Sequence, residues 1–334
     1  MFNHIADAVK SPMLIKLRDN LSFARFEVLK VYSTLTAIEQ LLGSGTIQPG
    51  YTLLDSSSGI YAYSLALACH RYGMKCRIIA SRTVDKALLV QLQILGAEVE
   101  QVQSGGNLKM DQSRRVERIK EILASESDVY WMRQYHDTIH YNGYQPIAKQ
   151  IVRELGGEAV TIVGGVGSGC STGGVARSLR EAGYPAELIG VQPFGSVTFA
   201  SEKIDDPGII IAGIGSAIPF ENVKHALYDQ IHWVSFQYGM SATVALLKRH
   251  AIFAGLSSGC GYLVASAESL KHPDRQYIVI GADTGHRYVD DVYSRHAEAL
   301  NIDALAPSEI TTASEISFPW SFARWNRREL SQFN

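Results

Sequence analysis

The stretch VTIVGGVGSGCSTGGVARSLRE, residues 160–181, indicates a strand, a glycine-rich loop and a helix in succession. The β-branched run at 160–163 is typical of a buried strand. The loop at 164–174 carries six glycines, and helical periodicity follows from Val175. Backbone N–H groups at a helix N-terminus and the helix dipole together favour an anion, and the loop's serine hydroxyls add donors. We therefore predict that this loop binds a phosphate.

The same alternation of strands and helices runs outward from this stretch in both directions. Short apolar runs predict strands at 51–55, 75–80, 98–102, 129–132, 187–193 and 277–283. Helical patterns lie between them at 30–42, 63–73, 85–96, 113–124, 144–155 and 240–250. This order predicts an α/β fold of mostly parallel sheets with helices on both faces. The segment 301–334 loses the alternation, and its Trp320 and Trp325 predict a tail packed on a surface or a partner subunit.

The composition limits the class of protein. Of 334 residues, 46% are hydrophobic and 19% are charged, which suits one large domain or two smaller ones. A net charge of −2 gives no electrostatic reason to expect nucleic acid or a membrane surface as a partner. The four cysteines form no CxxC pair, the N-terminus lacks a signal-peptide apolar region, and no apolar run approaches the ~20 residues of a membrane span. We expect a cytoplasmic protein with reduced thiols.

Ligands in α/β folds bind beyond the carboxyl ends of the strands. The sequence offers four segments in that position, each rich in Gly, Ser or Thr: 56–61, 164–173, 256–260 and 282–287. Their shared composition predicts that they converge on one binding site.

Two familiar phosphate-binding motifs are absent from the sequence. No GxxxxGK[ST] occurs, and the dinucleotide fingerprint fails because its third glycine position is Cys170. A serine hydrolase is an alternative, since residues 169–173 satisfy GxSxG with Ser171 as nucleophile and with Asp283 and His286 as partners. Those two partners stand only three residues apart, which disfavours separate loops behind the serine.

A candidate nucleophile and the candidate metal ligands remain. Lys30 lies between Val28-Leu29 and Val31-Tyr32, and a lysine that forms a Schiff base must be partly desolvated, so its surroundings suit that role. His136 and His140 stand four apart but no third ligand is evident, so we predict no metal site.

Several motifs, taken together in order, resemble the pyridoxal-phosphate enzymes of the cysteine synthase and cystathionine β-synthase group, the fold-type II family. Residues 11–14 (SPML) resemble its opening TPL(V) motif and residues 23–27 (FARFE) its FAKLE strand. Residues 30–59 correspond without a gap. Further counterparts are GVQPFGS (190–196), GIGSAIP (213–219), GLSSG (255–259) and ADTGHRY (282–288). The resemblance covers residues 11 to about 295.

The resemblance implies a role for particular residues. Lys30 falls on the catalytic lysine, which also binds the cofactor pyridoxal 5'-phosphate. Gln134 matches a glutamine that contacts the substrate carboxylate. Thr284 falls on the position of the hydroxyl residue that is hydrogen-bonded to the pyridine nitrogen. The family's substrate-carboxylate loop TSGNT corresponds to Ser57, Ser58, Gly59, Ile60 and Tyr61. Its cofactor-phosphate loop GTGGT corresponds to Gly167, Ser168, Gly169, Cys170 and Ser171.

The resemblance also implies an architecture. The fold would have two open, twisted, mostly parallel sheets flanked by helices, as in the tryptophan synthase β-like enzymes. Residues 30–140 would form a smaller mobile domain with the lysine and the substrate-carboxylate loop. Residues 12–29 and 141–300 would form a larger domain with the phosphate loop, followed by the tail at 301–334. The family further implies a homodimer.

The activity implied is β-replacement on an activated serine, O-acetylserine or O-phosphoserine, with a sulfur or amine nucleophile. The segments VYWMRQY, AIFAG and RYVDDVYS favour the branch that makes a diaminopropionate-type precursor. A serine or threonine dehydratase and a non-catalytic paralogue are alternatives. The chain departs from the family in three places: the NPGGS segment before Lys30 is missing, Ile60 replaces an asparagine, and Cys170 replaces a glycine.

Overall fold

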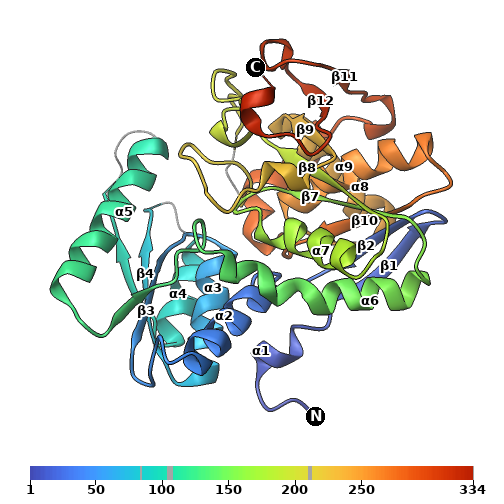
Figure 1. Cartoon of the computed structure of the whole chain (residues 1–334). Helices are drawn as coiled ribbons and strands as arrows, with labels where there is room; N and C mark the ends of the chain where they lie inside the picture. The colour runs from blue at the N-terminus through green and yellow to red at the C-terminus, as the bar shows by residue number, and fades with distance from the viewer. Residues whose placement is uncertain (83–84, 104–107, 210–212, 334) are drawn as a thin grey trace. The chain divides into compact units, whose positions relative to one another are not determined.

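The computed structural model describes residues 1–82, 85–103, 108–209 and 213–333 (Figure 1). The chain forms two compact units. The first unit contains Met1–Ser11 and Val28–Gly143, and the second contains Pro12–Glu27 and Tyr144–Asn334. No helix among the described residues is long and apolar enough to cross a bilayer.

The first unit is built on a four-stranded parallel sheet with the order β5-β4-β3-β6. Helix α5 covers one face and packs Ile119 and Ile122 on Leu54 and Ile79, while α2 and α3 lie on the other side (Figure 1). The strands are β3 (Thr52–Ser56), β4 (Lys75–Ala80), β5 (Glu98–Gln101) and β6 (Val129–Trp131). The helices are α1 (Ile5–Ala8), α2 (Val31–Gly43), α3 (Ile60–Tyr72), α4 (Lys86–Ile94) and α5 (Leu108–Ser125).

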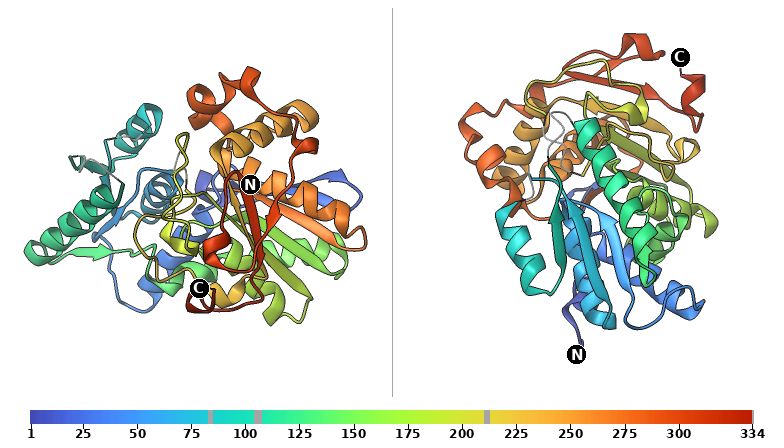
Figure 2. Two further views of the ribbon diagram at one scale, coloured as in Figure 1. Left: turned by 90° about the horizontal axis from the view of Figure 1, so that it is seen from above. Right: turned by 90° about the vertical axis from the view of Figure 1, so that its left-hand side faces the viewer.

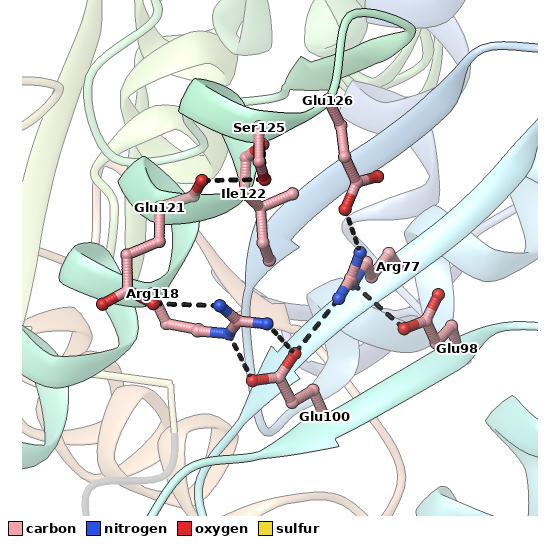
Figure 3. Close-up of polar contacts among 8 residues, drawn as sticks. All are labelled: Arg77, Glu98, Glu100, Arg118, Glu121, Ile122, Ser125 and Glu126. Carbon is pink, nitrogen blue, oxygen red and sulfur yellow. Dashed lines mark hydrogen bonds and ion pairs between the residues drawn. The ribbon is translucent and has the colours of Figure 1, made fainter.

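An ion-pair network joins β4, β5 and α5 in this unit (Figure 3). Arg77 of β4 contacts Glu98 and Glu100 of β5 and also Glu126, which follows α5. Arg118 of α5 contacts Glu100 with a 2.5 Å separation between Nε and Oε1. The Arg77 side chain is largely buried, so its three carboxylate partners offset the cost of removing its charge from water.

The second unit is built on an eight-stranded sheet with the order β1-β2-β10-β7-β8-β9-β12-β11. The central strands of this sheet are parallel to one another; in sheet order they are β2, β10, β7, β8 and β9. Antiparallel pairs flank them at β1–β2 and β9–β12. The strands are β1 (Met13–Arg18), β2 (Leu21–Arg25), β7 (Val160–Gly165), β8 (Ala186–Gln192), β9 (Gln230–Val234), β10 (Gln276–Gly281), β11 (Ser308–Glu309) and β12 (Trp320–Arg324). The helices are α6 (Gln145–Leu155), α7 (Cys170–Glu181), α8 (Phe236–His250) and α9 (Leu256–Lys271). The predicted α/β fold with two mostly parallel, helix-flanked sheets is confirmed.

Two predicted loops are shorter than expected. Helix α7 begins at Cys170 rather than Val175, because Gly169 adopts a left-handed conformation (φ 81°) that starts the helix, and the N–H of Gly173 already donates to the carbonyl of Gly169. The segment 256–260, predicted as a loop, is the first turn of α9. Glycines and serines inside these first turns conceal the helical periodicity.

The C-terminal segment enters the sheet. Strand β12 pairs antiparallel with β9, a strand that we did not predict, and Figure 2 shows the C-terminal segment in red. The indole of Trp320 donates to Nδ1 of His232 at 3.1 Å, and both side chains are buried. Strand β12 therefore covers the edge of β9, which would otherwise expose unpaired backbone groups.

Candidate functional site

Lys30 directly precedes helix α2 in the first unit. Its Nζ donates to Oε1 of Gln134 at 3.3 Å and lies 5.6 Å from the centre of the Tyr61 ring. The four flanking residues, Val28, Leu29, Val31 and Tyr32, are buried. The structure thus sets a partly buried lysine among apolar neighbours and brings it to a glutamine 104 positions later in the chain.

The segment 56–61 follows the carboxyl end of β3 and leads into α3. The Ser57 hydroxyl accepts hydrogen bonds from the N–H groups of Gly59 (3.3 Å) and Ala62 (3.2 Å). The Ser58 hydroxyl bonds with Ser81, whose N–H donates to it at 2.8 Å. Helix α3 has no acidic residue in its first turn, and the amides that open a helix lack intrahelical acceptors. This helix start is therefore suited to a carboxylate.

Tyr61 and His140 form a buried aromatic pair behind this loop. Their rings meet edge to face with centroids 5.8 Å apart. Burial raises the pKa of Tyr61 well above its ordinary value, and burial lowers the pKa of His140. Nε2 of His140 bonds the Met132 carbonyl at 2.8 Å. His140 is therefore packed in the interior of this unit. Among the residues that the structure describes, no three His, Cys, Asp or Glu side chains form a group that could hold a metal.

Asp55 is a site residue that sequence reasoning missed. It lies in β3, immediately before the 56–61 segment, and is buried. The N–H of Gln134 donates to Oδ2 of Asp55 at 2.9 Å, and Nε1 of Trp131 donates to Oδ1 at 3.1 Å. Burial raises the pKa of Asp55 to about 6, against the lowering effect of these hydrogen bonds. The sequence signal that could have identified Asp55 is an acidic residue near the end of a predicted strand, directly before a segment rich in Ser and Gly.

The glycine-rich loop of the second unit connects β7 to α7. A Cβ atom on Gly167 would overlap the carbonyl oxygen of Gly213, and one on Gly169 would stand 2.9 Å from the carbonyl oxygen of Asn222. No side chain caps α7, and its first turn carries no acidic residue. A helix start of this kind is suited to an anion, and the phosphate site at this loop stays a prediction. Cys170 is buried, and its Sγ lies 3.8 Å from the Ser168 carbonyl oxygen.

Gln192, at the end of β8, holds this loop and was also missed. Its Nε2 donates to the carbonyl of Val166 at 2.6 Å, and the N–H of Gly215 donates to the same oxygen at 2.9 Å. Oε1 of Gln192 accepts from the Ser196 hydroxyl at 3.1 Å. Both ends of the buried amide are used, so the side chain fixes the entry to the glycine loop.

Thr284 follows β10, which pairs in parallel with β7, so the 282–285 segment and the glycine loop leave the same edge of the sheet. The Thr284 hydroxyl lies 2.9 Å from Nδ1 of His286. The adjacent Asp283 is buried, which raises its pKa to about 6. The Tyr288 hydroxyl donates to Asp283 at 3.4 Å. His286 and Asp283, proposed above as hydrolase partners, are thus engaged with Thr284 and Tyr288 respectively.

Comparison with known families identifies the class of protein. Residues 2–282 match the family described as "Pyridoxal-phosphate dependent enzyme", and the chain belongs to this family. It is therefore a pyridoxal-phosphate-dependent enzyme. The residues present fit a cofactor that carries a phosphate and an aldehyde: the uncapped start of α7 suits the phosphate, and the partly buried amine of Lys30 suits the aldehyde.

The chain is also similar in sequence to individual enzymes of known name. The chain is 31% identical to N-(2-amino-2-carboxyethyl)-L-glutamate synthase of Ralstonia nicotianae over 307 residues, covering 87% of this chain and 88% of the relative. It is 28% identical to the enzyme of the same name from Cupriavidus metallidurans over 316 residues, covering 87% and 89%. It is 29% identical to cysteine synthase of Helicobacter pylori over 252 residues, covering 74% and 79%.

Solved structures show the same fold. The O-acetylserine-dependent cystathionine β-synthase of Helicobacter pylori has a TM-score of 0.76 at 24% identity, covering 87% of this chain and 98% of that one. The cysteine synthase of Entamoeba histolytica has a TM-score of 0.78 at 21% identity, covering 88% and 91%.

Proposed function

We propose that this enzyme catalyses β-replacement on an activated serine, O-phosphoserine or O-acetylserine, with the amino group of glutamate as nucleophile. The product would be N-(2-amino-2-carboxyethyl)-L-glutamate, in which the glutamate nitrogen is bonded to C3 of an alanine unit. Two synthases named for this product each match 87% of the chain. The structural observation that supports the proposal is the contact of Lys30 with Gln134, two residues of one unit that both match site positions of the family.

The proposed reaction exchanges one bond at C3 of the serine derivative. The C3–O bond breaks, and phosphate or acetate leaves with the electron pair. A C3–N bond then forms to glutamate, whose nitrogen loses one proton. Bound pyridoxal phosphate supplies an electron sink that stabilises the negative charge left at the substrate Cα when its proton is removed.

Lys30 would hold the cofactor covalently, and its freed amine would remove the Cα proton and return it after nitrogen addition. A lysine amine must be unprotonated to act as a base, and partial burial among apolar residues favours that form. Gln134 can accept a hydrogen bond from the Lys30 amine, as the 3.3 Å contact indicates. We infer that this contact is the resting position of the amine.

The segment 57–61 and Gln134 would bind the substrate carboxylate. Ile60 carries no polar group, and the Ser57 hydroxyl already accepts from two amides of its own loop. We therefore infer that the opening amides of α3 and the helix dipole supply most of the attraction. The asparagine-to-isoleucine change would then leave this carboxylate site intact.

Residues 167–171 would bind the cofactor phosphate, and Thr284 would meet the pyridine nitrogen. The first role is supported by the start of α7, which no side chain caps, and by Gly167, where a Cβ atom would overlap the carbonyl oxygen of Gly213. The Thr284 hydroxyl is neutral and would accept or donate there without protonating the pyridine nitrogen, which would favour loss or exchange of the C3 substituent over transamination.

Sulfide is the second candidate nucleophile, and its product would be cysteine. The cysteine synthases of Helicobacter pylori and Campylobacter jejuni match 74% and 78% of the chain. They match less of it than the glutamate-adduct synthases do, so we place glutamate first.

Product analysis by mass spectrometry tests these assignments. The purified enzyme is supplied with O-phosphoserine or O-acetylserine, together with glutamate, sulfide or neither. We expect the glutamate adduct as the main product, and Lys30→Ala should form none. Cysteine alone would favour the second candidate, while keto acid without any adduct would favour a dehydratase. A protein that binds no pyridoxal phosphate would exclude all three.

We also propose that the enzyme works in the cytoplasm as a homodimer. The four cysteines are buried thiols outside any disulfide, as expected in a reducing compartment, and the dimer is the form that the family resemblance implies. Light scattering of the purified protein tests the dimer, and a monomeric mass with full activity would exclude it.

A further inference from the structure

We propose that Asp55 is a positioning residue that fixes Gln134 and, through it, the amine of Lys30. This inference rests on the proposed function of Lys30 as the cofactor-binding lysine. The residues that carry it belong to one unit and to three of its segments: the end of β3, the turn after β6, and the residue before α2.

Asp55 gathers donors from two neighbouring strands. Strands β3 and β6 run parallel, with Leu54 opposite Trp131. The Asp55 carboxylate accepts from the N–H of Ser56 at 2.7 Å and from the indole of Trp131 at 3.1 Å through Oδ1. Its other oxygen, Oδ2, accepts from the N–H of Gln134 at 2.9 Å. A buried carboxylate with several N–H donors forms strong, directional bonds, so Asp55 fixes the chain direction after β6.

The turn between β6 and Gln134 requires such an anchor. Arg133 has a φ of 51°, in the left-handed region that side-chain-bearing residues seldom adopt. Strained backbone of this kind persists where surrounding bonds hold it. The N–H groups of His136 and Asp137 donate to the Arg133 carbonyl at 2.9 Å, and Asp55 holds the next residue, Gln134.

Gln134 passes this constraint to the lysine. Its buried side chain donates through Nε2 to the Ser56 carbonyl at 2.8 Å, and its Oε1 accepts from Lys30 at 3.3 Å. Asp55 therefore fixes the backbone of Gln134, and the carbonyl next to Asp55 fixes its side chain. Lys30 is reached from Asp55 through a single intervening residue.

The Asp55→Asn variant separates this role from simple stabilisation. An asparagine amide facing the N–H of Gln134 sets donor against donor, so Gln134 must shift and the hydrogen bond between Lys30 and Gln134 is lost. Loss of the hydrogen bond to Gln134 makes the Lys30 amine more readily available as a nucleophile.

Asp206→Asn is the matched control. Asp206 is a buried aspartate of the other unit that accepts backbone hydrogen bonds from Gly208 at 3.2 Å and Phe236 at 2.7 Å. Its loss should affect stability in the same way without touching Lys30. Thermal unfolding of both variants measures the stability change.

The test is acylation of cofactor-free protein by acetic anhydride at neutral pH, with Lys30 followed by peptide mass spectrometry against the exposed Lys149. We expect Asp55→Asn to change the Lys30 rate at least threefold, towards faster labelling, and Asp206→Asn to leave it unchanged. A folded Asp55→Asn protein that labels Lys30 at the wild-type rate would overturn the proposal.

Gln134→Met keeps the test decisive if Asp55→Asn does not fold. It removes the Oε1 atom that accepts from Lys30 while leaving the backbone N–H bonded to Asp55, and the same rise in labelling is expected. An unchanged rate in this variant would show that Gln134 does not hold Lys30 and would also overturn the proposal. Failure of the proposed function is distinguishable, because it would appear as wild-type protein that binds no pyridoxal phosphate, whatever the labelling rates.

Discussion

Gly167 passes so close to Gly213 that a Cβ atom on Gly167 would overlap the carbonyl oxygen of Gly213. The loop after β7 can take this path only with glycine at that position. No side chain caps the start of α7, the helix that this loop enters, which is why we assign the cofactor phosphate to this loop.

Gly167→Ala should therefore weaken cofactor binding. The added methyl must displace backbone at Gly213, and we expect at least about a tenfold loss of pyridoxal-phosphate affinity in an absorbance titration. Gly43→Ala is the control, because nothing lies within 4 Å of a Cβ there. Equal affinities for the two variants would contradict the phosphate assignment.

Gln192→Glu should also loosen the loop after β7. An ionised glutamate cannot donate to the Val166 carbonyl, so a buried bond of 2.6 Å is lost and an unpaired charge is introduced. We expect the free energy of unfolding to fall by about 2–4 kcal/mol, together with weaker cofactor binding. Urea unfolding measures the first effect. A variant as stable as the wild type would show that the Gln192 bond does not hold the loop.

Asp283 should make stability depend on pH. Burial raises its pKa to about 6 from 3.8, so the folded state binds more protons than the unfolded state between these values. Its contribution to stability is then full below pH ~4 and is lost as the pH rises through ~6, by up to about 3 kcal/mol. Asp283→Asn should flatten the stability profile over this window relative to wild type. Parallel profiles for the two proteins would be the contrary result.

Trp320 should contribute strongly to the second unit. Its indole donates to His232, whose pKa burial lowers to about 3, so the ring nitrogen accepts as a neutral base. Trp320→Phe removes this bond while retaining an aromatic ring, and we expect a loss of about 1–3 kcal/mol in chemical denaturation. Phe318→Ala, at an exposed position, should cost less. The reverse order would mean that β12 does not stabilise the sheet edge.

Sequence patterns predict those features of this protein that depend on the local order of residues along the chain. The alternation of strands and helices predicts the fold, and the glycine-rich loop before a helix predicts an anion site at 164–174, which stays a prediction. The start of α7 was placed too late because Gly173 and Gly174 are uncharacteristic of helices, although their small size lets this helix lie buried.

Other features depend on contacts between distant residues and leave no local pattern. Asp55 meets Gln134 only because β3 and β6 are neighbours. Gln192 acts on a loop 26 residues earlier. Strand β9 is short and carries the polar residue His232, so its sequence does not resemble a buried strand. His232 can be buried because Trp320, far along the chain, donates to it.

The central claim is that this enzyme joins the nitrogen of glutamate to C3 of an activated serine. The most direct measurement is mass spectrometry of the product formed from O-phosphoserine or O-acetylserine and glutamate with an isotopically labelled amino nitrogen. We predict one product that retains the label and fragments with the labelled nitrogen attached to the three-carbon unit. Consumption of both activated serines with all labelled glutamate recovered unchanged would contradict the claim.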